Sequence, residues 1–315
     1  MVQLWKNALE SAQRIALVCH VSPDMDTLGS AVGLRYILEN MGKTVTVYAQ
    51  DEVAPRFMFL EGMSEVRLPD EEAYDLCVAV DVSDEARMGT AKAVFDRAAA
   101  TAMIDHHPTT VPFAPAYVLD AKAAATAQII VKLCGEFGWE IPEKAAMCLW
   151  AGISTDSGNF SFDSVTAETF RAAAVCMEKG AKPGIITEKL YRTSTEGHVR
   201  MMGRVLNGLE LSREGRVCII RYTQQDLQEC NAEQEDASGI INAALEIESV
   251  CVVAQLSERS GLIKCSMRAK APYDVAAVAK IYGGGGHVRA AGCSLPDKTL
   301  EEACAEMEAA LANIL

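Results

Sequence analysis

Four short apolar segments in the first half of the chain restrict its fold more than any other feature. These strand candidates are residues 14–21, 44–50, 76–84 and 101–107. Helices are expected where apolar residues recur at helical spacing, in residues 30–43, 122–137, 143–155 and 166–180. Short strands that alternate with helices form parallel sheets covered by helices on both faces. The sequence therefore predicts an α/β domain with a parallel sheet.

The second half of the chain has a different pattern, typical of a smaller α+β unit. Its strand candidates are residues 215–223, 249–258 and 261–270, with a turn at 259–261. A helix at 274–282, a glycine-rich loop and a C-terminal helix are expected to follow. Residues 191–208 have a helical pattern at their centre, followed by glycine and charged residues, which indicates a helical connector between the two domains. We therefore expect a first domain at 1–190, a helical linker at 191–208 and a second domain at 209–315.

Charge and cysteine content narrow the class of protein. The formal net charge is −14, which argues against broad binding to long nucleic acid, because such binding needs a basic stripe. No apolar run approaches the ~18 residues of a membrane span, and the N-terminus lacks the pattern of a signal peptide. Eleven cysteines occur without Cys-x-x-Cys spacing, as expected for buried free thiols in a cytoplasmic protein.

Aspartates and histidines follow the apolar segments of the first half. They are His20, Asp24, Asp26, Asp81, Asp105, His106, His107 and Asp156. Open α/β sheets bind their ligands beyond the carboxyl ends of the strands, so these side chains are expected at one edge of the sheet. Carboxylates and imidazoles together suit Mn²⁺, Fe²⁺, Co²⁺ or Zn²⁺ better than Ca²⁺. The set exceeds the needs of one ion, which favours a two-metal site with a bridging carboxylate.

Each aspartate also has a purely structural interpretation. An aspartate after a strand is commonly a helix cap or a turn residue, and this applies to Asp24, Asp26, Asp84 and Asp105. The metal-site hypothesis depends on the whole set, because polar clusters follow one apolar segment after another.

The glycine-rich stretch in the second half predicts a binding loop. It contains Gly283, Gly284, Gly285 and Gly286, directly before His287. Such a run cannot form a helix interior, where each glycine costs about 1 kcal/mol. It would let a ligand approach the backbone and would offer N–H groups to an anion. A flexible turn is the alternative. Arg268, just upstream, could bind a phosphate or pair with a surface acid.

With these motifs in place, the sequence resembles the DHH phosphoesterases. Five segments are similar to family motifs in the same order: residues 20–30, 80–84, 105–107, 154–160 and 283–292. The two-domain layout is most similar to the bacterial oligoribonuclease and pAp phosphatase group, since the extra domains of cyclic-dinucleotide phosphodiesterases and RecJ-type exonucleases do not occur in this sequence. The first motif departs from the common pattern at Ser22 and Met25, so its loop shape and metal preference could differ.

The resemblance implies a role for each motif residue. His20 and Asp24 would bind one Mn²⁺, while Asp26, His106 and Asp156 would bind the other. Asp81 would bridge the two ions, and His107 would either hold a metal ligand in place or contact the substrate phosphate. The residues with implied catalytic roles are Asp81, His106 and His107. The implied substrate-binding residues are His107, Arg268, Gly283, Gly284, Gly285, Gly286 and His287.

The resemblance also implies the reaction and its partners. We expect hydrolysis of short oligoribonucleotides, of 3'-phosphoadenosine 5'-phosphate (pAp), or of both, by water that two divalent metal ions activate. Linear or cyclic dinucleotides such as pGpG are alternative substrates, and a nucleotide sensor without turnover is the alternative of another class. Neither long duplex nucleic acid nor a membrane is an expected partner, and a homodimer is the candidate assembly.

Overall fold

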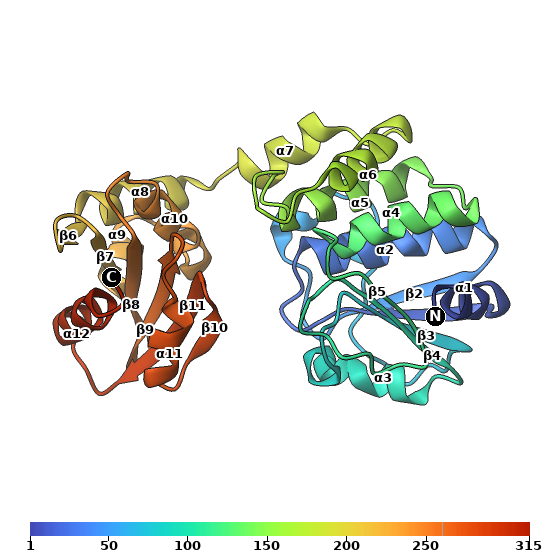
Figure 1. The fold of residues 1–315 in the computed structure, drawn as a ribbon, viewed down its shortest axis with the longest axis horizontal. Helices are drawn as coiled ribbons and strands as arrows, with labels where there is room; N and C mark the ends of the chain where they lie inside the picture. Colours follow the sequence, from blue (N-terminus) through green and yellow to red (C-terminus); the bar gives the residue numbers. More distant parts are fainter. Residues whose placement is uncertain (260) are drawn as a thin grey trace. The chain divides into compact units, whose positions relative to one another are not determined.

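A computed structural model of the chain describes residues 1–259 and 261–315. The turn expected at 259–261 includes residue 260, which lies outside the described residues. The chain divides into two units, Met1–Thr193 and Ser194–Leu315 (Figure 1).

The first unit contains a five-stranded parallel sheet, which confirms the predicted α/β class. Its strands are β1 (Arg14–Val18), β2 (Thr44–Tyr48), β3 (Leu76–Val80), β4 (Thr101–Asp105) and β5 (Ala116–Leu119), in the order β2-β1-β3-β4-β5. Every residue of β3 is buried, as expected for a central strand covered on both faces. β5 was not among the predicted strands, because its four residues are too short to give a clear pattern.

Helices cover both faces of this sheet. They are α1 (Val2–Ser11), α2 (Met25–Asn40), α3 (Lys92–Arg97), α4 (Thr126–Phe137), α5 (Glu143–Asp156), α6 (Ala167–Glu178) and α7 (Pro183–Tyr191), with short 3₁₀ turns η1 (Pro55–Phe57), η2 (Met63–Glu65) and η3 (Glu85–Ala91). Alternate residues of β1 enter different cores: Leu17 packs in a core with residues of α1, α2, α4 and α5, and Val18 in a core with residues of η3 and α3 (Figure 1).

The strand order determines where a ligand can bind. β1 pairs with β2 on one side and with β3 on the other, so the chain connections leave β1 and β3 in opposite directions. In parallel sheets such a switch point opens a crevice at the carboxyl ends of the strands. The first unit therefore has its natural binding site beyond Val18 and Val80.

A six-stranded mixed sheet forms the second unit, which confirms the predicted α+β class. Its strands are β6 (Glu210–Ser212), β7 (Val217–Tyr222), β8 (Val252–Arg259), β9 (Leu262–Ala269), β10 (Gly285–His287) and β11 (Ala290–Pro296), in the order β10-β11-β9-β8-β7-β6. Only the β7–β8 pairing is parallel among the described strands of this sheet. Its helices are α8 (Glu196–Asn207), α9 (Gln224–Glu229), α10 (Ile240–Leu245), α11 (Val275–Ile281) and α12 (Leu300–Ala312), with a 3₁₀ turn η4 (Gln234–Ala237).

Two cores lie on the two faces of this sheet. Residues of α11 and α12 share one core with Val217, while residues of α8, α9 and α10 share the other with Cys218. The segment 191–208, expected as a linker, contains α8, whose Met201 and Val205 are buried in the second of these cores.

The glycine-rich segment differs from the loop that we expected. Gly285–His287 form strand β10, which pairs antiparallel with β11. A Cβ atom on Gly284 would lie 2.2 Å from the carbonyl oxygen of Gly292, and one on Gly286 would lie 2.5 Å from that of Ala290. Close packing of the two strands therefore explains two of the four glycines without a ligand.

The described helices are all too short or too polar to cross a membrane. All eleven cysteines are free, and ten of them are buried.

Candidate functional site

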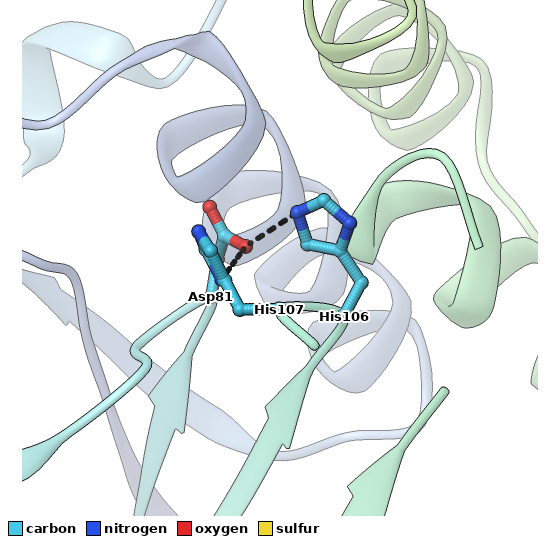
Figure 2. Close-up of side chains that lie close together, drawn as sticks. All are labelled: Asp81, His106 and His107. Atoms are coloured by element: carbon cyan, nitrogen blue, oxygen red, sulfur yellow. Dashed lines mark ion pairs between the residues drawn. The ribbon is translucent and has the colours of Figure 1, made fainter. Parts of the chain in front are cut away.

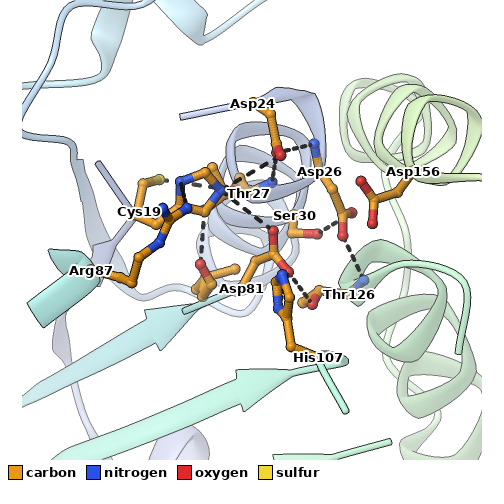
Figure 3. A network of polar contacts seen from close by, with 12 residues as sticks. Cys19, Asp24, Asp26, Thr27, Ser30, Asp81, Arg87, His107, Thr126 and Asp156 are labelled. Atoms are coloured by element: carbon orange, nitrogen blue, oxygen red, sulfur yellow. Dashed lines mark hydrogen bonds and ion pairs between the residues drawn. The ribbon is translucent and has the colours of Figure 1, made fainter. Parts of the chain in front are cut away.

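The polar residues at the strand ends meet beyond the carboxyl edge of the parallel sheet. His20 follows β1, Asp81 comes directly after β3, and His106 and His107 come directly after β4. Asp26 lies in the first turn of α2, and Asp156 is the last residue of α5. Figure 3 shows Asp26, Asp81, His107 and Asp156 of this set pointing to one place. The expected convergence at one edge of the sheet is thus present.

His20 forms the first group with two aspartates. Its Nε2 atom lies 3.7 Å from Oδ2 of Asp24 and 3.8 Å from Oδ2 of Asp81. Its Nδ1 atom lies 2.8 Å from the carbonyl oxygen of Val21. A carbonyl oxygen can only accept a hydrogen bond, so Nδ1 carries a proton and donates the hydrogen bond to Val21. Nε2 is therefore the ring nitrogen that faces the carboxylates, as in a histidine that ligates a metal through Nε2.

His106 forms the second group in the same manner. Its Nε2 atom lies 3.1 Å from Asp156, 3.5 Å from Oδ1 of Asp81 and 3.9 Å from Asp26. Its Nδ1 atom lies 3.2 Å from the carbonyl oxygen of Ala123, so Nε2 is again the ring nitrogen that faces the carboxylates. Oδ2 of Asp81 faces His20, while its Oδ1 lies near both His106 and His107 (Figure 2). Asp81 is the carboxylate best placed to contact two ions.

His107 is held by the aspartate of its own motif. Its Nδ1 atom lies 2.8 Å from Oδ1 of Asp105 and 3.8 Å from Oδ1 of Asp81. Asp105 is fully buried and also accepts a hydrogen bond from Thr110. Burial alone would raise the pKa of Asp105, but the hydrogen bonds from His107 and Thr110 hold it below the usual value. Asp105 also accepts a hydrogen bond from the backbone N–H of His107 at 3.3 Å, so it is a turn residue whose charge in addition orients the His107 ring.

Burial makes this cluster of like charges costly without a cation. Burial and the charge of Asp156 raise the pKa of Asp26 to about 7. Burial, together with the charges of Asp26 and Asp24, raises the pKa of Asp81 well above its usual value. Burial alone would lower the pKa of His106, but the hydrogen bond to Asp156 and the nearby carboxylates raise it to about 10. A divalent cation would take the place of these protons, so the residues fit a metal site.

Three ligand groups of this kind occur among the described residues. In each, one ligand atom per residue lies within 4.8 Å of the others: Asp81, His106 and His107; His20, Asp24 and Asp81; and Asp26, His106 and Asp156. Asp81 belongs to two of the groups, and so does His106.

Two residues that were not predicted from the sequence, Thr126 and Ala127, hold the carboxylates of Asp26 and Asp81 in place. Asp26 accepts hydrogen bonds from the backbone N–H groups of Thr126, at 2.7 Å, and Ala127, at 3.1 Å. The hydroxyl of Thr126 donates to Oδ1 of Asp81 at 2.8 Å. Thr126 lies 100 residues from Asp26, and nothing in its local sequence indicates a site residue. The free N–H groups at a helix start bind anions well, which is why the start of α4 suits this role.

Asp24 satisfies both interpretations that the sequence left open. Its Oδ1 atom caps α2 by accepting from the backbone N–H groups of Asp26, at 3.0 Å, and Thr27, at 3.1 Å. Its Oδ2 atom faces His20. Capping fixes the carboxylate close to His20, so the structural role and the candidate ligand role support each other.

In the second unit, strand pairing places two predicted substrate residues on one face of the sheet. Arg268 of β9 and His287 of β10 are both register partners of Ala290 in β11, and partners across antiparallel strands point to the same face. His287 is exposed, and Arg268 donates from Nη1 to the carbonyl oxygen of Met267 at 2.9 Å. Burial lowers the pKa of Arg268, which is consistent with a guanidinium only partly open to water.

Comparison with known proteins supplies the family. A bifunctional oligoribonuclease and PAP phosphatase of Thermus thermophilus, NrnA, is 30% identical over 300 residues, which are 92% of this chain and 86% of that protein. The chain belongs to the DHH family of phosphoesterases. Residues 14–153 match the DHH family, N-terminal domain, and residues 218–313 match the DHHA1 domain.

Two further proteins are similar to nearly the whole chain. NrnA of Bacillus subtilis is 27% identical over 286 residues, which are 89% of this chain and 89% of that protein. The crystal structure of an exopolyphosphatase-related protein from Bacteroides fragilis is 26% identical, with a TM-score of 0.93 over 99% of this chain and 95% of that one. As a DHH phosphoesterase, the chain is an enzyme of the hydrolase class.

Proposed function

We propose that this DHH protein is a manganese-dependent phosphoesterase that cleaves short oligoribonucleotides, pAp, or both. The observation that carries the proposal is the position of Asp81, whose two oxygens face His20 and His106 from two separate ligand groups. One carboxylate shared by two such groups suits a pair of divalent ions. The names of the relatives from Thermus thermophilus and Bacillus subtilis support the substrate class.

We assign each ligand from its place in the cluster. His20 and Asp24 would hold one ion, and Asp26, His106 and Asp156 would hold the other, with Asp81 shared. Bound ions would supply Lewis acidity, which lowers the pKa of a water molecule and neutralises charge on phosphoryl oxygens. Mn²⁺ accepts both carboxylate and imidazole ligands, which makes it the proposed ion.

The chain's own groups would orient the reacting atoms. The N–H groups at the start of α4 fix Asp26, and the hydroxyl of Thr126 fixes Asp81. Asp105 holds His107 through Nδ1, which leaves Nε2 of that ring available to contact a phosphoryl oxygen. A ring held in one orientation before the substrate binds loses little entropy in the reaction.

The substrate's nucleotide part is assigned to the second unit. We propose that Arg268 and His287 bind it, together with the backbone of residues 283–286. A guanidinium and a set of backbone N–H groups are suited to phosphate recognition. The first unit would accordingly be the catalytic domain and the second the substrate-binding domain.

A substrate panel tests the proposal. Protein loaded with Mn²⁺ is incubated with pAp, pGpG, a cyclic dinucleotide and oligoribonucleotides of two to seven residues. We expect turnover of pAp, of the shortest oligoribonucleotides, or of both, and a steep decline with length. If pGpG or a cyclic dinucleotide is hydrolysed preferentially, that dinucleotide is the substrate and the proposed substrate class is wrong. Tight nucleotide binding without any turnover would instead indicate a sensor.

A further inference from the structure

Arg87 is a positively charged residue at the candidate metal centre that the assignments above leave without a role. It lies in η3, six residues after Asp81, and its side chain points toward the network of polar contacts (Figure 3). Its Nη2 atom lies 3.4 Å from Nδ1 of His20. The residue is exposed, so a small molecule at the site could reach it.

The contact between Arg87 and His20 is not a hydrogen bond. Nδ1 of His20 already donates its proton to the carbonyl oxygen of Val21, at 2.8 Å. A guanidinium has donors only, so two donors face each other across 3.4 Å. No carboxylate forms an ion pair with Arg87 within the part of the chain that the structure describes. The guanidinium therefore keeps its hydrogen-bonding capacity for another acceptor.

Hydrogen bonds place the backbone around Arg87 beside the site. Its carbonyl oxygen accepts from the backbone N–H of Val21 at 2.7 Å, and its own N–H donates to the side chain of Asp84 at 3.2 Å. Gly89 allows the turn at φ +54°, where a Cβ atom would lie 2.1 Å from Oε1 of Gln50. That same oxygen accepts from the N–H of Thr90 at 2.9 Å.

The charge of the cluster indicates what Arg87 would bind. The carboxylates of Asp24, Asp26, Asp81 and Asp156 carry as much negative charge as two divalent ions carry positive charge, so the loaded centre would be close to neutral. A phosphate ester that enters it brings further negative charge. Among the described side chains that contact the His20 ring, Arg87 is the one that carries a positive charge at neutral pH irrespective of its surroundings. A guanidinium also matches the geometry of phosphoryl oxygens.

We propose that Arg87 binds a non-bridging oxygen of the substrate's scissile phosphoryl group. This inference rests on the proposed phosphoesterase function, and it adds a substrate-binding residue in the first unit. It differs from the assignments of Arg268 and His287, which concern the nucleotide part of the substrate. Because every ester substrate contains the scissile phosphoryl group, Arg87 should matter even for a substrate without a nucleotide.

The test compares Arg87→Ala and Arg87→Lys with Arg14→Gln in the full chain loaded with Mn²⁺. Arg14 is a suitable control because it lies at the opposite end of β1 and pairs with Glu72 on the surface. We expect Arg87→Ala to lower kcat/KM by about 10²-fold, the scale for removing one donor to a developing charge. The loss should be similar for a dinucleotide and for bis-p-nitrophenyl phosphate. Arg87→Lys should keep part of the rate, and added guanidinium ion should partly restore Arg87→Ala.

Two further measurements separate this inference from the proposed function. Metal content and Tm should be unchanged in Arg87→Ala, since Arg87 is not a ligand. Calorimetry with AMP on the Mn²⁺-loaded protein should show binding weakened at least about tenfold, whether or not the wild type turns over. Rates and AMP affinity equal to the wild type, or loss of bound metal, would overturn the role of Arg87. An inactive wild type that binds AMP through Arg87 would overturn only the proposed reaction, and a wild type that does neither would overturn both.

Discussion

Asp81 combines a candidate functional role with two features that destabilise the folded state, a left-handed backbone conformation and a buried carboxylate. It has φ +61° and is 2% exposed. Left-handed backbone conformations are uncommon outside glycine, although aspartate adopts them more readily than most residues. In this conformation the two carboxylate oxygens of Asp81 face His20 and His106. Buried strain of this kind is commonly associated with functional sites.

Replacement of Asp81 should therefore separate activity from stability. We expect Asp81→Asn to lower kcat by at least about 10²-fold, since a shared anionic ligand is lost. In the metal-free protein its Tm should be no lower than that of the wild type, because the buried charge is removed while the hydrogen bond from Thr126 can persist. Rate assays and thermal unfolding by circular dichroism measure the two effects.

Asp96→Asn is the matched control, because Asp96 is an exposed aspartate that pairs with Lys92. It should change neither activity nor metal content. A near-normal rate in Asp81→Asn would mean that Asp81 does not bridge the metal centre.

At the level of elements, α2 and α5 pack closely enough to bring Asp26 and Asp156 into one cluster. The close approach depends on glycines. A Cβ atom on Gly29 of α2 would lie 2.5 Å from the carbonyl oxygen of Cys148 in α5. One on Gly152 of α5 would lie 2.8 Å from Oδ1 of Asp26. The helix interface thus sets the distance between two candidate ligands.

Gly29→Ala tests this interface. We expect it to lower the free energy of unfolding by about 1–3 kcal/mol, the usual cost of overpacking, and to reduce activity by displacing Asp26. Gly135→Ala in α4 is the control, since a Cβ atom there meets nothing within 4 Å. It should raise the free energy of unfolding by up to about 1 kcal/mol. Urea denaturation measures both, and equal effects would show that the α2–α5 contact tolerates a methyl group.

At the level of the whole molecule, the metal centre should contribute to stability as well as to catalysis. Removal of divalent ions with EDTA should abolish activity and lower Tm, because the buried carboxylates then repel one another, and anything that binds only the native state stabilises it. Added Mn²⁺ should restore both properties. Full activity in excess chelator would contradict the two-metal proposal. Asp81→Asn should show a smaller rise of Tm with Mn²⁺ than the wild type.

A second prediction at this level concerns the division of labour between the two units. Arg268→Ala and His287→Ala should raise KM and lower kcat for nucleotide substrates, since binding energy away from the reacting group also helps to orient it. Bound metal should be unchanged, and bis-p-nitrophenyl phosphate should be hydrolysed almost normally. Equal losses on both substrates, or loss of metal, would place these residues in the catalytic centre. Arg87→Ala, which should affect both substrates, is the built-in comparison.

The amino-acid sequence by itself determined the local features of this protein. Strands such as Leu76–Val80 and Thr101–Asp105 are apolar and short, so they could be predicted from pattern alone. The aspartates and histidines that follow them could be predicted to share one edge, because parallel strands end on the same side of a sheet. The beginning of α2 was not predicted correctly. The helix was expected to start at residue 30, but Asp24 caps it and it starts at Met25.

Only the tertiary structure decided which groups meet. The hydrogen bonds of Thr126 to Asp26 and Asp81 join segments that are 100 and 45 residues apart. Arg87 faces His20 only in the folded chain, where the carbonyl oxygen of Val21 already occupies Nδ1 of that ring. The pairing of Gly285–His287 with β11 also depends on partners outside the segment. Local sequence fixes where a strand or helix can form, but these contacts depend on strand order and helix packing, which arise from interactions between residues far apart in the chain.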